Sequence, residues 1–400
     1  MYPAKTTKQS IVFDKKLMSE YLAYRDSTKR LASVAGLWPR ENPSHFYRSL
    51  PYVSVLISLG MVFGIAGYVR QHLNSVALIT KGMSVMTSFL SVALKVVCIM
   101  SHRQELIQLH QMLDGHFWTL LNDVKLSRVV LNRVAAFRYL SNLLTTFLVL
   151  ASVTYVVIPI VYVIQQHHHQ VQPVKYILIF PGVYPWKIPA NGLVYRLHYT
   201  FETAANVCLT CVTAGADSLF TLYVFQMMGQ LREMAYQISH LDYERDDAKR
   251  VIRNCVLRHE TLIKSRDILD KIYGPVVLWV MLTNAVVLCS VMFQFTQMKH
   301  ISVFRVTFLT AYTMLKLTQT FMYSWAGSCL IEQNEDYKTA VYSSKWYKNK
   351  QFMVSILIML SPKALSLTAC KFSTVSIDIF SMVLNTAASY FFLLQTVHDG

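Results

Sequence analysis

The stretch "KFSTVSIDIFSMVLNTAASYFFLLQT", at residues 371–396, decides the fold. It is longer than the roughly 20 residues that a helix needs to cross the hydrocarbon core of a bilayer. It is also rich in Ser, Thr, Asn and Gln, which makes it too polar for a helix that faces only lipid. A membrane helix of this kind lines a watery space or packs tightly against copies of itself. The stretch therefore predicts a membrane span with a wet or self-associating face.

The composition of the whole chain agrees with a membrane protein. Of its 400 residues 54% are hydrophobic and 15% are charged, whereas soluble domains carry roughly 25% charged residues. The apolar residues form long blocks without the two-residue alternation of a membrane β-barrel. The blocks predict an all-α membrane protein with seven transmembrane helices, at about 51–70, 76–100, 137–164, 195–225, 273–298, 303–331 and 372–397.

The positions of Lys and Arg predict the orientation. The N-terminal tail and the segments 101–136, 226–272 and 332–350 hold 26 of these residues, in groups of nine, four, nine and four. The opposite set of loops holds only Lys175, Lys187 and Lys299. Cytosolic loops carry the excess of positive charge, so we expect a cytosolic N-terminus and an extracellular C-terminus. This topology, with anionic lipid, accounts for the net charge of +16 without nucleic acid as a partner.

The cytosolic segments have the patterns of packed helices. Residues 226–272 carry two apolar stripes at three- and four-residue spacing, separated by "DYERDD". Residues 332–350 gather aromatic side chains that are costly to leave in water, and we expect Tyr342, Trp346 and Tyr347 to pack in an anchor region between subunits. We divide the chain into a cytosolic segment (1–50), four spans that form most of a ligand pocket (51–225), a cytosolic anchor loop (226–272), the fifth and sixth spans (273–331), a second anchor segment with a short helix (332–371), and the last span with its tail (372–400).

No arrangement in the sequence favours an enzyme. The seven cysteines are scattered, and His167 to His169 are consecutive, so neither set has the spacing of a metal site. Phosphate-binding glycine loops, nucleophilic triads and paired catalytic carboxylates are missing from the sequence. We therefore expect no catalytic residue, no metal and no cofactor.

Charged and aromatic residues inside the spans point to a binding function. Charges in a membrane are costly and mark functional sites or structural pairs; a Lys81–Glu202 pair and a Lys316–Asp217 pair are both compatible with the spacing. Aromatic and Met side chains recur at similar depth in four spans, which suits a pocket for a small apolar ligand. The candidate pocket residues are Met83, Met86, Phe89, Tyr155, Tyr162, Tyr199, Phe201, Phe308 and Tyr312.

From the end of the sixth span onward the chain resembles the insect odorant receptors. The resemblance rests on "CLIEQNEDYKTAVYSSKWY" (329–347), on "QFMVSILIMLSPKALSLTACKF" (351–372), and most specifically on Ser-Tyr-Phe-x-Leu-Leu-Gln at 389–395. It implies an odorant-gated, non-selective channel for Na⁺, K⁺ and Ca²⁺ in the plasma membrane of an olfactory dendrite. It also implies a heterotetramer with a co-receptor, in which this chain is the tuning subunit because its 226–272 loop is short.

The same resemblance assigns roles to the end of the last span. Leu393 would form the hydrophobic constriction, Leu394 would lie beside it, and Gln395 and Thr396 would lie just outside. A metabotropic or gustatory-type receptor of the same topology is the alternative. A transporter would show an internal repeat with helices broken at matched positions, which the sequence lacks.

Overall fold

The computed structural model describes residues 4–186, 188–189, 192–241, 247–296, 303–344, 346, 352–360 and 365–399. Within them the chain is almost entirely helical, apart from one two-stranded hairpin. The elements are α1 (Ala4–Val34), α2 (His45–Gln71), α3 (Val76–Ser101), α4 (Arg103–Leu121), α5 (Val124–Val130), α6 (Val134–His168), α7 (Leu193–Ser239), α8 (Asp247–Thr296), α9 (Val303–Ser343), α10 (Met353–Leu360), β1 (Thr368–Ala369), β2 (Ser373–Thr374) and α11 (Ile377–Asp399).

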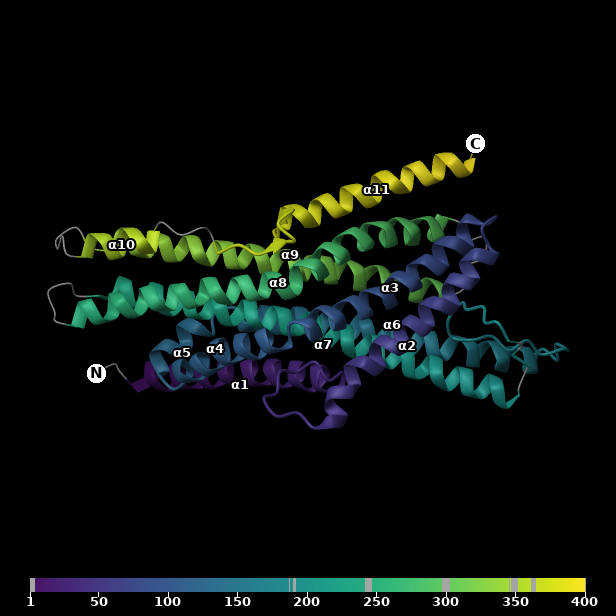
Figure 1. The fold of residues 1–400 in the computed structure, drawn as a ribbon, viewed down its shortest axis with the longest axis horizontal. Coiled ribbons are helices and arrows are strands. Elements are labelled where there is room, and N and C mark those ends of the chain that lie inside the picture. Colours follow the sequence, from purple (N-terminus) through teal and green to yellow (C-terminus); the bar gives the residue numbers. More distant parts are fainter. Residues whose placement is uncertain are drawn as a thin grey trace.

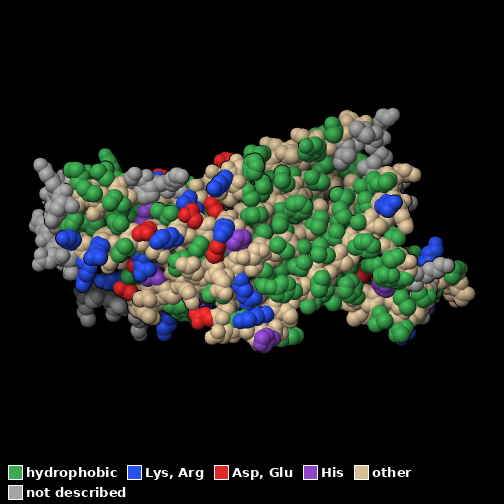
Figure 2. Space-filling model, viewed as in Figure 1, with side chains coloured by type: hydrophobic (Ala, Val, Ile, Leu, Met, Phe, Trp, Pro, Cys, Tyr) green, Lys and Arg blue, Asp and Glu red, His purple; other side chains and the backbone are tan. Residues whose placement is uncertain are grey.

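The molecule is elongated and divides into an apolar half and a charged half. Figure 1 shows α7, α8 and α9 running along the long axis, with α1, α4, α5 and α10 at one end and α2, α3, α6 and α11 toward the other. Hydrophobic side chains cover the face over α3, α8 and α11, whereas Lys, Arg, Asp and Glu gather at the end with α4, α5 and α10 (Figure 2). This division is that of a helical bundle half in a membrane and half in water.

Five helices are long and apolar enough to cross a membrane: α2, α3, α6, α7 and α8. Helix α11 contains a shorter apolar segment, Ile377–Leu393. The predicted spans all fall on helices, but three of the helices are much longer than predicted. The two amphipathic stripes of 226–272 are the end of α7 and the beginning of α8, so they continue the spans as straight cytosolic extensions.

Helix α7 is the hub of the bundle. Every residue from Val212 to Met234 is buried, because α1, α4, α5, α6, α8 and α9 all pack against this helix. Gly215 lets α1 approach closely: a Cβ there would lie 2.8 Å from the backbone N of Ala32. A helix that is covered on every side can carry polar residues only where neighbouring helices satisfy them.

The hairpin β1–β2 precedes α11 and corrects the predicted start of the last span. The prediction placed residues 372–376 in the helix, but β2 pairs there with β1 (Thr374 with Thr368), and α11 begins at Ile377. Cys370 and Lys371 adopt positive φ angles of 53° and 63°, which reverse the chain and are unfavourable inside a right-handed helix. Asp270 of α8 holds the hairpin by accepting hydrogen bonds from the N–H and the hydroxyl of Thr368, both at 2.9 Å.

Candidate functional site: a cavity in the apolar half and an exposed face of α11

A small cavity lies among α3, α6, α7 and α9 in the apolar half. Its volume is ≈ 40 Å³, room for only a few water molecules. A ligand of odorant size therefore needs side chains to move before it can enter. The cavity is lined by Val85, Ser88, Leu148, Ala151, Ser152, Tyr155, Phe180, Asn206, Leu209, Thr210, Tyr312 and Leu315.

Aromatic rings form the walls and the outer cover of the cavity. The ring of Tyr155 lies 4.5 Å from that of Phe308 and 5.0 Å from that of Phe180, and Phe180 meets Phe89 edge-on at 5.2 Å. Phe180 belongs to the loop between α6 and α7, which folds back onto the bundle. These packed rings offer dispersion and quadrupole contacts to an apolar or aromatic guest.

Glu202 of α7 holds the covering loop in place. Its carboxylate is fully buried and accepts hydrogen bonds from Phe180 N and Tyr184 Oη, both at 3.1 Å. Burial and the adjacent carboxylate raise the pKa of the Tyr184 hydroxyl, which lies in the loop outside the span, so that this hydroxyl remains a donor. The loop is thereby fixed over the cavity by a buried polar contact.

The polar groups of the cavity differ in what they leave available. Tyr312 Oη donates to Ser84 O at 3.1 Å and lies 3.0 Å from Ser88 Oγ, while Asn206 Nδ2 donates to the carbonyl and hydroxyl oxygens of Ser152. Tyr155 Oη has no hydrogen bond to another residue in the described part of the chain. It is the donor best placed to accept a ligand carbonyl, ether or hydroxyl oxygen.

The predicted pocket residues are distributed around this cavity. Tyr155 and Tyr312 line it; Phe89 and Phe308 contact its lining rings. Met86 and Tyr199 pack in the same cluster, and Met83 is half-buried. Tyr162 and Phe201 are 39% and 41% exposed on the outside of their helices and do not line the cavity.

Phe180 and Asn206 are lining residues that the sequence prediction missed. Phe180 lies in "ILIFPGVYPW" (177–186), an apolar run inside a loop predicted to be in water. That run was the available signal, since an apolar loop segment needs a surface to cover it. Asn206 gave no signal, because a single amide in an apolar helix fits any buried hydrogen bond equally well.

The predicted Lys316–Asp217 pair is corrected by the structure. Asp217 pairs instead with Lys95 of α3, with 2.6 Å between Nζ and Oδ1, and both side chains are at most 1% exposed. Gln319 and Tyr323 of α9 each donate a hydrogen bond of 2.6 Å to the same carboxylate. Lys316 is also buried and lies over the Tyr312 ring at 5.5 Å. Lys95 was the missed residue, and its signal was a charge inside the apolar run "SVALKVVCIM".

The other intramembrane charges do not share one site. Glu202 bonds to the covering loop, as described above, whereas Lys81 near the start of α3 has an exposed side chain. The Lys95–Asp217 pair lies deeper in the bundle and joins α3, α7 and α9.

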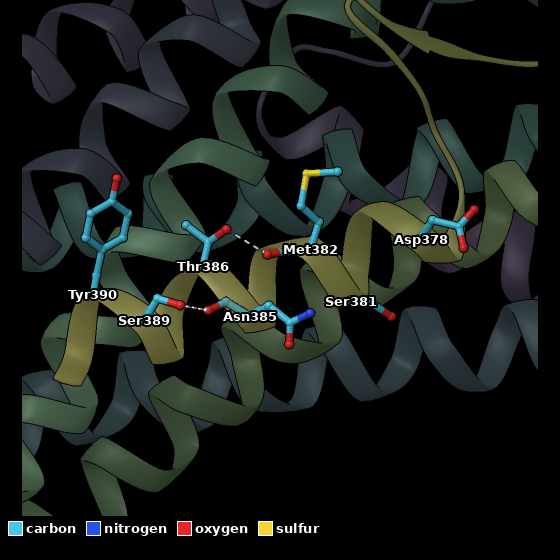
Figure 3. Close-up of a pocket in the computed structure, with 7 residues that line it drawn as sticks. All are labelled: Asp378, Ser381, Met382, Asn385, Thr386, Ser389 and Tyr390. Carbon is cyan, nitrogen blue, oxygen red and sulfur yellow. Dashed lines mark hydrogen bonds between the residues drawn. The ribbon is translucent and has the colours of Figure 1, made fainter. Parts of the chain in front are cut away.

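Helix α11 is packed on only one side. Ile379, Val383 and Ala387 are buried against the bundle, where α8 and α9 cover them. The opposite side forms an open groove of ≈ 530 Å³, which we call the α11 groove. Figure 3 shows its seven residues projecting from one side of the helix: Asp378, Ser381, Met382, Asn385, Thr386, Ser389 and Tyr390.

The predicted gate residues follow the α11 groove. Leu393 is 58% exposed, and the side chains of Gln395 and Thr396 are exposed as well. Thr396 Oγ1 donates to the carbonyl of Leu393 at 2.8 Å. The side chain of Leu394 lies outside the described residues.

Helix α9 connects the cavity to the start of α11. It carries Tyr312 and Leu315 of the lining, then Gln319 and Tyr323 of the Asp217 cluster. Further along, Ser328 Oγ accepts a hydrogen bond of 2.8 Å from Ile377 N, the first amide of α11. Ser328 thus caps α11 from a different helix, in place of a local N-cap side chain.

The predicted anchor residues lie at the charged end. Tyr342 is 72% exposed, and its carbonyl accepts a hydrogen bond of 3.2 Å from Trp346 Nε1. Tyr347 lies outside the described residues. Nearby α10 exposes Met353, Val354, Leu357 and Ile358.

Comparison with known proteins places this geometry in context. A family model described as "7tm Odorant receptor" matches residues 75–388. Odorant receptor 13a of Drosophila melanogaster is 21% identical, over 91% of this chain and 93% of that protein. The odorant receptor coreceptor of Anopheles gambiae is 31% identical, but only over 36% of this chain and 30% of the coreceptor.

The fold has a solved counterpart. The insect olfactory receptor OR5 from Machilis hrabei, whose structure was determined in complex with eugenol, aligns with a TM-score of 0.78 and 16% sequence identity, covering 94% of this chain and 100% of that one. The predicted all-α, seven-span membrane fold is therefore confirmed. The predicted cytosolic N-terminus stays a prediction.

Proposed function

This chain belongs to the insect odorant receptor family, and from that premise we propose that it is the tuning subunit of an odorant-gated cation channel in the plasma membrane. It is a multi-pass membrane protein and not the co-receptor, since the coreceptors match only about a third of its length. No relative that it resembles has an enzyme's name. The observation that carries the proposal is the one-sided packing of α11.

A polar groove on a membrane helix requires either water or a partner. Ser381, Asn385 and Ser389 stand on the uncovered side of α11, where contact with hydrocarbon would leave their polar atoms poorly satisfied. Four copies arranged around one axis would turn these sides toward a shared aqueous path. Na⁺, K⁺ and Ca²⁺ would then pass partly hydrated along hydroxyl and amide groups.

The gate in this proposal is the apolar end of the same helix. Leu393 from each subunit, with Leu394 beside it, would narrow the path and close it by excluding water. Gln395 and Thr396 would restore a polar surface just outside the constriction. Since α11 is attached on one side only, a tilt of the helix would move Leu393 without dismantling the bundle.

The ligand in this proposal is a small lipophilic odorant with one hydrogen-bond acceptor. Its support is the aromatic cavity with the free donor Tyr155 Oη, and the related fold of OR5, which was solved with eugenol. Because the cavity is nearly closed, the ligand would displace rings such as Phe308 and Phe180. Helix α9 would carry that displacement past the Asp217 cluster to Ser328 and the start of α11.

The partner in this proposal is the odorant co-receptor, in a heterotetramer. The exposed apolar side chains of α10, together with Tyr342 and Trp346, offer a subunit contact at the charged end. The predicted orientation places that end in the cytosol.

The test is electrical. The chain is expressed with an insect odorant co-receptor in cells that lack other odorant receptors, and currents are recorded during a panel of volatile ligands. We expect an evoked, non-selective cation current that persists when G-protein signalling is blocked. A current that the block abolishes would favour the metabotropic alternative, and silence despite surface expression would refute the channel proposal. Tyr155→Phe should then weaken the response to carbonyl or hydroxyl ligands more than to hydrocarbons.

A further inference from the structure

A second groove lies on the surface at the inner end of the predicted spans. It runs between α6, α9 and α11, has a volume of ≈ 420 Å³, and is almost purely apolar. We call it the inner groove. Its lining residues are Ala136, Tyr139, Leu140, Leu143, Leu317, Thr318, Phe321, Trp325 and Phe380.

A basic pocket lies beyond the inner end of this groove. It has a volume of ≈ 590 Å³, and we call it the arginine pocket. Arg128, Arg133 and Arg232 line it, together with one carboxylate, Asp336, and the ring of Tyr236. Leu17, Val129 and Ala235 supply apolar wall between the charges.

Arg232 is a buried cation without a carboxylate partner. It is only 6% exposed. Its Nε donates to Gln333 Oε1 at 2.7 Å, and its Nη1 donates to the carbonyls of Asn132 and Val130 at 2.5 Å and 3.3 Å. Burial and the nearby Arg133 lower the pKa of Arg232 to about 10, so it stays charged at neutral pH. A buried charge that only neutral dipoles satisfy favours the arrival of an anion.

Arg133 joins the pocket to the groove. It sits at the beginning of α6 with φ 65°, and its guanidinium pairs with both carboxylate oxygens of Glu332 at 2.7 Å and 2.8 Å. Ala136, the first residue of the inner groove, follows three positions later on α6. Around this joint three arginines face two carboxylates, Glu332 and Asp336, which leaves one positive charge in excess.

We propose that the inner groove and the arginine pocket together bind one anionic phospholipid of the inner leaflet, with an acyl chain in the groove and a phosphorylated headgroup on Arg133 and Arg232. The order of the two parts fits such a molecule: an apolar channel within the span of α6 and α9, then cations just beyond the end of the span. Guanidinium groups match phosphate in geometry and charge, and basic pockets at the cytosolic ends of membrane helices recognise such headgroups.

The bound lipid would touch the pore helix of the proposed channel. Phe380 of α11 lines the groove and packs edge-on against Phe321 of α9 at 5.5 Å. An acyl chain in the groove would therefore fill the gap between α11 and the bundle next to the hinge at Ile377. The lipid's effect would be to hold α11 in its place, in addition to any action of the odorant.

The experiment measures lipid binding directly. The complex of the full chain with its co-receptor is purified in detergent, and native mass spectrometry counts retained phosphatidylinositol bisphosphate, phosphatidylserine and phosphatidylcholine. Arg133→Gln and Arg232→Gln should each weaken the retention of phosphatidylinositol bisphosphate about fivefold. Arg253→Gln is the matched control, because Arg253 is an exposed arginine of α8 outside the pocket.

The groove has its own matched pair of variants. Ala136→Trp places a large ring in the groove, whereas Ala135→Trp places the same ring on an exposed neighbour that does not line it. Only Ala136→Trp should displace the lipid. If Arg232→Gln fails to assemble, Arg133→Gln and the tryptophan pair still decide the matter.

Three results would overturn the inference. One is equal retention of phosphatidylcholine and the anionic lipids; another is equal behaviour of Ala135→Trp and Ala136→Trp. The third is full competition by soluble inositol phosphate with no effect of Ala136→Trp, which would make the pocket a site for free anions. A groove that is filled by the neighbouring subunit would give the first result. All these readouts are independent of odorant-evoked current, so they can fail while the channel proposal stands.

Discussion

Two helices of similar apolar character, α7 and α11, are held in opposite ways. From Val212 to Met234 α7 is covered on all sides, whereas α11 is covered only along Ile379, Val383 and Ala387. Polar groups on α7 are satisfied by other helices: Lys95, Gln319 and Tyr323 surround Asp217. On α11, Thr386 and Ser389 donate only to carbonyls of their own helix, at 2.8 Å and 2.9 Å. The first helix is a fixed axis; the second is a movable element whose open side awaits water or another subunit.

The largest effect is expected where the buried axis loses a charge. Asp217→Ala leaves Lys95 buried without its counter-ion, which typically costs about 3–5 kcal/mol. We expect the folded complex to be lost from the cell surface or to unfold at a much lower temperature in fluorescence-detected size-exclusion chromatography. Asp217→Leu together with Lys95→Met should recover much of the stability, because an apolar pair of similar size leaves no buried charge.

The control for this change is Asp267→Asn, which removes a carboxylate that is 63% exposed and should change stability by less than about 0.5 kcal/mol. A wild-type melting profile for Asp217→Ala would mean that α7 is not the fixed axis.

Gly327 tests the joint between the two helices. A Cβ at this position on α9 would lie within contact distance of Val375 O, directly before α11, far closer than two non-bonded atoms approach. Gly327→Ala must push the hairpin and α11 away, and we expect a loss of about 1–3 kcal/mol and an altered resting conductance. Gly115→Ala is the matched control: nothing lies within 4 Å of its Cβ, and alanine favours a helix by up to about 1 kcal/mol. Equal behaviour of the two alanines would show that α11 is not seated on α9 at this point.

His259 tests whether tight packing extends along α8 into the charged half. Its ring is 5% exposed and lies 5.4 Å from that of Tyr337. Burial, and secondarily Lys338, lower its pKa to about 4 from the ordinary 6.5. A lowered histidine pKa means that the unfolded chain binds the proton more readily, so stability falls as the pH drops from about 6.5 toward 4.

The measurement is the unfolding midpoint at pH 7 and at pH 5. We expect His259 to account for a loss of about 1–2 kcal/mol at pH 5, and His259→Gln to remove that part of the pH dependence. An identical pH dependence in the two proteins would show that His259 is hydrated and that the packing opens at this end.

The smallest effect on stability is expected at the open side of α11. Leu393 is 58% exposed, so Leu393→Ala should change the unfolding midpoint by less than about 0.5 kcal/mol. The same substitution should raise resting conductance or change gating in patch-clamp recordings. A strongly destabilised protein would mean that Leu393 is packed in the assembly in a way that a movable gate is not.

The sequence predicted the elements of the fold better than their ends. Apolar blocks and the Lys and Arg bias reveal spans, but amphipathic stripes look the same in separate helices and in extensions of a span, so the lengths of α7 and α8 were missed. The late start of α11 depends on positive φ angles at Cys370 and Lys371, two residues whose identity does not demand them. Lys95 and Asp217 were both readable as buried charges; which helices bring them together is a matter of packing, which spacing along the chain does not encode.

The most direct test of the central proposal compares the two sides of α11. Single cysteines are placed at Asn385 and Ser389 on the open side and at Val383 and Ala387 on the packed side, and each variant is co-expressed with the co-receptor. A charged, membrane-impermeant thiol reagent is applied during odorant-evoked current. We expect rapid loss of current at Asn385 and Ser389 and none at Val383, Ala387 or in the parent chain with its native cysteines. Equal block on both sides, or block only at Val383 and Ala387, would contradict a pore lined by the open side of α11.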